Sequence, residues 1–166
     1  MKNCITLIGM PACGKSTIGV VLAKRLGKKF MDSDLLIQEK TGRLLRQLIE
    51  ENGDAGFRLI EDRVNSGIRT ENAVIAPGGS VIYGKNAMRN LKKISTIIYL
   101  KVSYQTLSRR LRNLHERGVS IKAGQTLKDL YEERIPYYEK YADITVDETG
   151  KSTQQIVDLI CGIIGE

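Results

Sequence analysis

Short apolar runs recur along the chain and alternate with longer stretches of helical periodicity. The apolar runs lie at residues 3–8, 29–31, 73–76, 96–101 and 143–146. Brief apolar runs bounded by polar residues and glycine are typical of β-strands. Because helices fill the intervals between these runs, the pattern predicts an α/β fold of three layers, with a five-stranded parallel sheet flanked by helices.

The helical stretches place apolar residues along one helix face. After the first strand, Ile18, Val21, Leu22 and Leu26 recur at this spacing. The irregular stretch 113–125 is glycine-bearing and basic, and we expect it to be a mobile lid. Elsewhere the periodicity predicts helices at about 15–26, 34–40, 43–51, 55–69, 85–92, 104–113, 126–140 and 152–164.

Length and composition narrow the class of protein. With 166 residues and no repeat or linker, the whole chain, 1–166, is predicted to be a single domain. Its three cysteines lie far apart without C-x-x-C spacing, so we expect neither a disulfide framework nor a zinc site. No apolar run approaches the length of a membrane span, and no signal-peptide pattern precedes the first strand. We therefore expect a cytoplasmic protein that binds no membrane.

The chain carries an excess of basic residues, 26 Lys and Arg against 19 Asp and Glu. Such an excess would suit a nucleic-acid partner. However, the basic residues are scattered, and only seven tyrosines and two phenylalanines interleave them. No recognisable nucleic-acid-binding module is present. We therefore assign the charge to a solvated surface and to phosphate binding, and we expect no nucleic-acid partner.

The clearest chemical signal comes directly after the first predicted strand. Residues 9–17 read GMPACGKST, a complete G-x-x-x-x-G-K-[ST] phosphate loop. In such a loop, backbone N–H groups and the N-terminus of the following helix bind phosphate oxygens. Lys15 is predicted to reach the β- and γ-phosphates, and the hydroxyl of Ser16 to ligate Mg²⁺. The loop therefore predicts a nucleoside triphosphate as phosphate donor and leaves the acceptor open.

Candidate acceptor residues follow the next two strands, where ligands of parallel α/β sheets lie. Asp32 and Asp34 follow the second strand. One carboxylate could bind Mg²⁺ and the other the acceptor hydroxyl, as phosphoryl transfer requires. Alternatively, the two could form a solvated turn and a helix cap. Gly78 and Gly79 follow the third strand. They could let the backbone approach a ligand closely, or they could simply form a tight turn.

The motif F-R-x-x-E at 57–61 lies on a predicted helix. Its Arg58 and Glu61 are three residues apart, so they share a helix face and can form an ion pair. An arginine held in this way would present a planar fork to a carboxylate on the acceptor. Exposed ion pairs of this kind are also common on helix surfaces without any function. The pair therefore supports an acceptor site only in combination with the neighbouring motifs.

Together these motifs resemble the shikimate kinases, which are small relatives of the nucleoside monophosphate kinases. The similarity covers nearly the whole chain. It includes Arg134 in the segment E-R-I-P-Y-Y-E, similar to the family's R-x-P-x-Y, and Arg110, similar to its adenine-stacking arginine. The resemblance implies a monomeric P-loop kinase that uses ATP and Mg²⁺ to phosphorylate a hydroxyl of shikimate, giving shikimate 3-phosphate and ADP.

The resemblance also implies roles at the donor end. The nucleotide would contact Ala12, Cys13, Gly14, Lys15, Ser16, Thr17 and Arg110. Cys13 also lies near a helix N-terminus, which would lower the pKa of its thiol, although we regard it first as a small loop residue. Mg²⁺ would be held by Ser16 and, through water, by Asp32.

At the acceptor end, shikimate would contact Asp34, Arg58, Gly78, Gly79 and Arg134. Glu61 would orient Arg58. The catalytic residues would be Asp34 as the base, Lys15, and Arg117 from the lid, which would neutralise charge on the transferring phosphoryl group.

Two segments depart from the family's pattern. The usual third glycine of the turn is Ser80 here, and the usual lid sequence R-P-L-L is replaced by R-G-V-S at 117–120. Both affect acceptor selection more than phosphoryl chemistry. A kinase for a related hydroxy acid or sugar acid is therefore the alternative hypothesis. A nucleotide-dependent regulatory or nucleic-acid-associated module is a third, but it would have no need of Asp32, Asp34 and Arg58.

Overall fold

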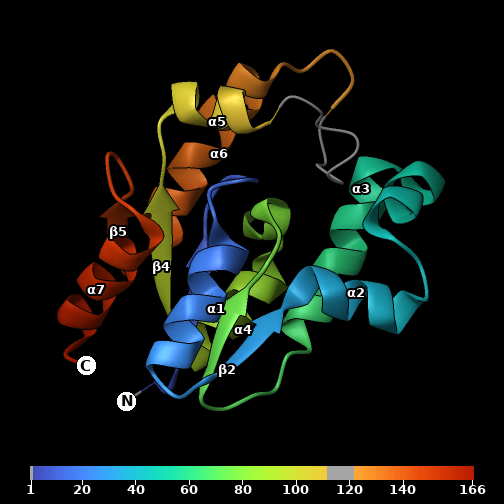
Figure 1. Cartoon of the computed structure of the whole chain (residues 1–166). Coiled ribbons are helices and arrows are strands. Elements are labelled where there is room, and N and C mark those ends of the chain that lie inside the picture. Colours follow the sequence, from blue (N-terminus) through green and yellow to red (C-terminus); the bar gives the residue numbers. More distant parts are fainter. Residues whose placement is uncertain (1, 112–121) are drawn as a thin grey trace.

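A parallel sheet forms the centre of the computed structural model, which describes residues 2–111 and 122–166 (Figure 1). Within these residues, five strands pair in the order β2-β3-β1-β4-β5, and every neighbouring pair is parallel. The prediction of a five-stranded parallel sheet is confirmed, and each predicted strand end lies within one residue of the observed one. The strands are β1 (Cys4–Ile8), β2 (Lys29–Asp32), β3 (Ala73–Ala76), β4 (Ser95–Lys101) and β5 (Ile144–Asp147).

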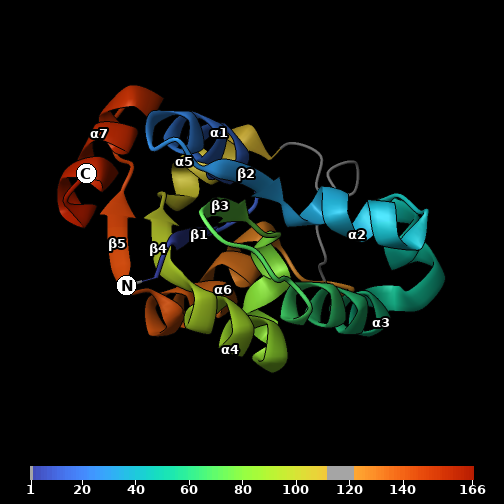
Figure 2. The same cartoon turned by 90° about the horizontal axis from the view of Figure 1, so that it is seen from below.

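Helices cover both faces of the sheet, which gives the predicted three layers (Figure 2). α1 and α7 lie on one face, and α3, α4 and α6 lie on the other. α2 extends beyond the edge strand β2. The helices are α1 (Lys15–Arg25), α2 (Ser33–Thr41), α3 (Leu45–Ser66), α4 (Lys85–Ile94), α5 (Tyr104–Arg110), α6 (Leu127–Tyr141) and α7 (Thr153–Ile164), with the 3-10 helix η1 (Gly79–Tyr83) after β3. No described helix is both long and apolar enough to cross a membrane.

The two helices predicted at 43–51 and 55–69 are joined end to end at a kink in α3. The observed α3 contains a single non-helical residue, Gly53, with φ 69° and ψ 176°. Glycine adopts such a positive φ without a steric penalty, so the chain is bent at this residue while the helical hydrogen bonds resume beyond it. The predicted interruption between the two helices is therefore confirmed, as a kink at Gly53.

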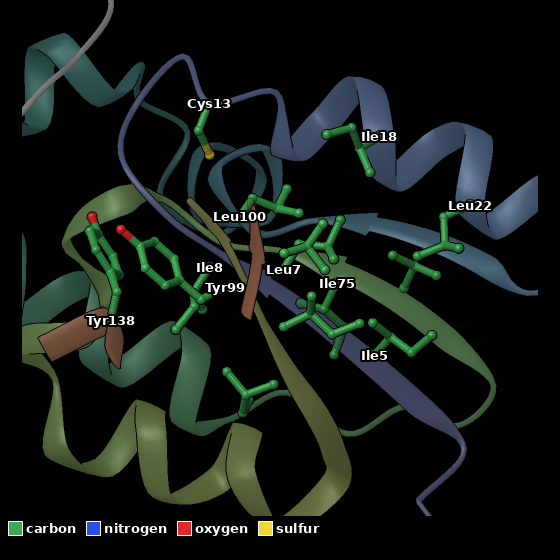
Figure 3. Packing of buried hydrophobic residues seen from close by; sticks show 14 of the residues in the cluster. Ile5, Leu7, Ile8, Cys13, Ile18, Leu22, Ile75, Tyr99, Leu100 and Tyr138 are labelled. Carbon is green, nitrogen blue, oxygen red and sulfur yellow. The ribbon is translucent and has the colours of Figure 1, made fainter. Parts of the chain in front are cut away.

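The core lies between the central strands and the helices on either side (Figure 3). Leu7 of β1 and Leu22 of α1 are fully buried, as is Tyr138 of α6. The ring of Tyr138 stacks on that of Tyr99 at 5.2 Å between centroids. Tyr138 therefore packs α6 against β4 in the core.

Tyr138 also links the core to the turn after β3. Its hydroxyl donates a hydrogen bond of 2.6 Å to the carbonyl oxygen of Gly79. Tyr138→Phe is expected to lower the free energy of unfolding by about 1–2 kcal/mol, because it leaves a buried carbonyl group unpaired. Urea denaturation measures the loss, with Tyr137→Phe as control because Tyr137 is 39% exposed. Equal midpoints for the two variants would contradict this contact's role.

The carboxyl ends of β1, β2 and β3 lie at the same edge of the sheet. They are followed by the phosphate loop, by Asp32 with Asp34, and by the glycine turn. Parallel pairing therefore brings three sequence-distant motifs together. Most of the predicted lid, 113–125, lies outside the described residues, and so does Arg117.

Candidate active site

The phosphate loop joins β1 to α1 and leaves the start of α1 open. Gly14, the residue that precedes α1, has φ 94°, and no side chain caps the helix. Ala12 also has a positive φ, 62°, which is uncommon outside glycine and typical of strained loops at functional sites. The first N–H groups of α1 are therefore available to an anion, as the sequence motif predicted.

Lys15 lies across this loop. Its Nζ donates hydrogen bonds to the carbonyl oxygens of Gly9 and Met10, at 2.8 and 2.9 Å. The thiol of Cys13 lies 3.7 Å from the same nitrogen and is buried. Burial raises the pKa of Cys13, and the charge of Lys15 opposes this only in part. The expected lowering of the thiol pKa is therefore wrong, and Cys13 is a small buried loop residue.

A cavity of about 330 Å³ joins the donor motif to the acceptor motifs. Its walls come from the phosphate loop, from α3, from the turn after β3 and from α6. Most of the predicted site residues meet here. Those that line it are Ala12, Gly14, Lys15, Ser16, Thr17, Asp32, Asp34, Gly78, Gly79 and Arg134.

Asp32 and Asp34 differ in their surroundings. Asp32 caps α2, because its Oδ1 accepts hydrogen bonds from the backbone N–H groups of Asp34 and Leu35, at 2.9 and 3.3 Å. Asp32 therefore caps a helix and also lines the cavity, and Asp34 lines the cavity as well. The Oδ1 of Asp34 is buried and has no hydrogen-bond partner among the described residues. The pKa of Asp34 is raised to about 6, mainly by burial and also by the charge of Asp32, while the charge of Lys15 opposes both.

A second buried carboxylate, Glu61, lies beside Asp34. A Cβ atom on Gly78 would lie 2.9 Å from the Oδ1 of Asp34 and 2.9 Å from the Oε2 of Glu61. Only glycine leaves room for both groups at this point of the turn. The other oxygen of Glu61, Oε1, accepts a hydrogen bond of 2.6 Å from the hydroxyl of Ser80.

The pKa of Glu61 rises to about 7, mainly because of burial, and the Ser80 hydrogen bond opposes the rise. Since the folded-state pKa exceeds the usual 4.5, the folded protein holds this proton more tightly than the unfolded chain. Stability is therefore lost as the pH rises from about 4.5 to about 7, and the loss is complete above pH 7. Glu61→Gln, which keeps an acceptor for Ser80, is expected to gain about 3 kcal/mol relative to wild type between pH 4.5 and pH 8. Denaturation across this range measures the difference, and a difference independent of pH would contradict it.

The predicted ion pair between Arg58 and Glu61 does not form. No Arg58 nitrogen lies within 4.0 Å of a Glu61 oxygen, and Glu61 is bonded to Ser80 instead. The guanidinium carbon of Arg58 lies 3.9 Å from the centre of the Tyr83 ring. Arg134 approaches the same ring at 5.5 Å and is 1% exposed. Tyr83 was not among the predicted site residues, because its position after the glycine turn carried no chemical signal.

A second cavity, of about 460 Å³, lies on the other side of the phosphate loop and includes Cys13, Thr17 and Arg110. The Nη1 of Arg110 donates a hydrogen bond of 2.9 Å to the carbonyl oxygen of Ala12 and lies 3.8 Å from Glu148. The position of Arg110 beside the loop suits its predicted contact with the nucleotide base. Glu148 was also missed. Burial raises its pKa to about 7, although Arg110 and Lys15 oppose the shift.

The sequence of the chain is similar to those of known proteins. The sequence profile of the family described as "Shikimate kinase" matches residues 11–164. The chain belongs to the shikimate kinase family. Among the curated shikimate kinases, that of Sulfurihydrogenibium sp. is 35% identical over 96% of each chain. That of Persephonella marina is 34% identical over 99% of each chain.

Solved shikimate kinases share the fold of this family member. The enzyme from Acinetobacter baumannii, in complex with shikimate, has a TM-score of 0.85 at 29% identity, covering 97% of this chain and 92% of its own. The enzyme from Aquifex aeolicus has a TM-score of 0.82 at 31% identity, covering 98% and 96%. A thymidylate kinase from Candida albicans, at 15% identity and a TM-score of 0.58, shares the fold alone.

Proposed function

We propose that this shikimate kinase family member transfers the γ-phosphoryl group of ATP to a hydroxyl of shikimate, giving shikimate 3-phosphate and ADP. One observation carries the proposal. A single cavity has a phosphate loop on one side and the buried groups Asp34, Glu61 and Arg134 on the other. Family membership supports ATP as the donor, and the shikimate complex of the Acinetobacter enzyme supports the acceptor.

The donor end would bind ATP through backbone and cationic groups. The uncapped N-terminus of α1 would hold the phosphates. Lys15 would exchange its bonds to the carbonyls of Gly9 and Met10 for bonds to the β- and γ-phosphate oxygens, which carry full charge. Arg110 would lie against the adenine in the second cavity.

The residues beside the loop fit Mg²⁺. Ser16 and Asp32 line the same cavity, and hydroxyl and carboxylate oxygens are ligands that Mg²⁺ prefers. Asp32 uses Oδ1 for its helix cap, so Oδ2 would face the metal or one of its waters. Bound Mg²⁺ would neutralise charge that develops on the phosphate oxygens during transfer.

Asp34 would orient the acceptor hydroxyl and take its proton. Its unpartnered Oδ1 can accept a hydrogen bond from that hydroxyl. With a pKa of about 6, the carboxylate is ionised at neutral pH and is more basic than an ordinary aspartate. As the proton moves to Asp34, the acceptor oxygen bonds to the γ-phosphorus and the bond to the leaving ADP oxygen breaks.

Arg58 and Arg134 would bind the acceptor carboxylate. Arg134 lines the cavity, and two buried nitrogens of Arg58, Nε and Nη2, have no hydrogen-bond partner among the described residues. A guanidinium fork matches the geometry of a carboxylate, so these groups select an acidic acceptor. The role of Arg117 at the transferring phosphoryl group stays a prediction, because this residue lies outside the described residues.

An acceptor panel in a coupled ADP-release assay tests the proposal. Saturable turnover is expected with shikimate, and little with quinate or gluconate, which carry a carboxylate on a different polyhydroxylated frame. The alternative acceptor class rests on Ser80, which lines the cavity, and on the sequence of the lid at 117–120, which lies outside the described residues. Turnover with gluconate or quinate and none with shikimate would overturn the proposed acceptor in favour of that alternative.

A further inference from the structure

The arginine that would recognise the acceptor needs a fixed orientation, and its expected partner is occupied elsewhere. Glu61 has one oxygen on the Ser80 hydroxyl, and its other oxygen faces Gly78. Among the described residues no carboxylate therefore forms an ion pair with Arg58, and the charges of Glu61 and Glu133 act on it only from a greater distance. A long side chain without a partner loses binding affinity, because each encounter with the ligand must first fix its rotamers.

The ring of Tyr83 fills this role in the structure. The guanidinium carbon of Arg58 lies 3.9 Å from the ring centroid, within the range of a cation–π contact. This contact uses the flat face of the guanidinium, whereas an ion pair would use its N–H edge. Since the five donors of arginine lie in its plane, a stacked Arg58 keeps that edge for a ligand. In agreement, the Nε and Nη2 atoms on this edge of Arg58 have no hydrogen-bond partner among the described residues.

Tyr83 is itself fixed by its surroundings. It ends η1, the short helix that begins at Gly79 in the turn after β3. Its ring packs against that of Tyr137 from α6 at 5.3 Å between centroids. Arg134, also on α6, lies 5.5 Å from the same ring. One aromatic ring thus contacts arginines from two helices and shares its own helical turn with Ser80, which holds Glu61.

We propose that Tyr83 is a positioning residue that holds Arg58 for recognition of the acceptor carboxylate, in place of an ion pair with Glu61. The inference rests on the proposed function, because it concerns the same acceptor site. Tyr83 would act through Arg58 and touch neither ATP nor the reacting atoms. Its loss should therefore raise the KM for the acceptor and leave the KM for ATP and kcat nearly unchanged.

Steady-state kinetics of three variants test this role. Tyr83→Leu is expected to raise the KM for shikimate about tenfold, the order of effect of a desolvated cation–π contact. Tyr83→Phe keeps the ring and should stay within about twofold of wild type. Tyr141→Leu is the matched control. Tyr141 is a half-buried tyrosine whose ring contacts Lys140 at 5.6 Å, away from the cavity, and its loss should change neither KM.

A double-mutant cycle separates positioning from general damage. In an Arg58→Leu background, Tyr83→Leu should raise the KM for shikimate no further, because the group that it positions is gone. If Tyr83→Leu lacks a cooperative unfolding transition, Tyr83→Met, whose longer and more flexible side chain adapts to the space of the ring, replaces it with the same expected result. The inference is overturned if Tyr83→Leu stays within twofold of wild type, if Tyr83→Phe loses as much, or if the effect persists without Arg58. Wild-type turnover of shikimate tests the proposed function separately, so the two failures can be told apart.

Discussion

Replacing Lys15 with methionine is expected to lower kcat by about three orders of magnitude and to leave the fold intact. The Nζ of Lys15 donates hydrogen bonds to the carbonyl oxygens of Gly9 and Met10 in the phosphate loop. In the ATP complex it would neutralise charge on the β- and γ-phosphates, and methionine fills similar space without that charge. The measurement is single-turnover phosphoryl transfer at saturating ATP, which separates the chemical step from nucleotide affinity.

The matched control for this change is Lys24→Met on the same helix. Lys24 is exposed near the end of α1, far along the helix from the phosphate loop. The Lys24→Met variant should keep the wild-type rate, and both variants should keep a cooperative unfolding transition in urea. A Lys15→Met protein with a rate within tenfold of wild type would contradict the assigned role of the loop.

Arg58→Leu is expected to weaken acceptor binding by about 2–5 kcal/mol, because it leaves a ligand carboxylate partly unpaired. Its effect should appear as a KM for shikimate raised at least about thirtyfold, with the KM for ATP little changed. Isothermal titration with shikimate, in the presence of ADP, measures the same loss without turnover.

Arg63→Leu provides the control for this second change. Arg63 lies on the same helix and is exposed. The substitution removes a positive charge from α3 at a distance from the cavity. A general electrostatic effect on an anionic substrate would therefore appear in both variants. Equal losses for the two changes would remove Arg58 from the acceptor site.

The phosphate loop and the residues after β2 and β3 could be predicted because their chemistry is local. The phosphate loop, Asp32 with Asp34, and the glycines 78 and 79 each follow a short apolar strand. In a parallel sheet the carboxyl ends of such strands meet at one edge. The order of the strands was not needed for this conclusion, since any parallel order of β1, β2 and β3 as neighbours brings the motifs together.

The ion pair between Arg58 and Glu61 was predicted wrongly because helix spacing permits a contact without requiring it. The hydroxyl of Ser80, a residue far from Glu61 in sequence, donates a hydrogen bond of 2.6 Å to the carboxylate of Glu61. The guanidinium group of Arg58 lies over the ring of Tyr83 instead. Both competitors come from η1, which was expected only as a turn. Tertiary contacts of this kind depend on how η1 packs against α3, and no local pattern encodes that packing.

Burial explains the other differences between sequence and structure. The thiol of Cys13 was expected to have a low pKa because of its helix N-terminus, but the surrounding core raises it. Glu148 lies beside Arg110 and the phosphate loop, although nothing in its sequence neighbourhood marks it as part of a cavity. The pKa of a group depends on its solvent exposure, which the sequence alone does not give.

The central claim is phosphoryl transfer from ATP to shikimate, and ³¹P NMR of the reaction mixture tests it most directly. With ATP, Mg²⁺ and shikimate, the wild-type protein should form ADP and a phosphate monoester in equal amounts, with the ester phosphorus coupled to a single ring proton of shikimate. Lys15→Met should leave ATP intact under the same conditions. ADP that accumulates together with inorganic phosphate alone, or ATP that is left unchanged by the wild-type protein, would contradict the claim.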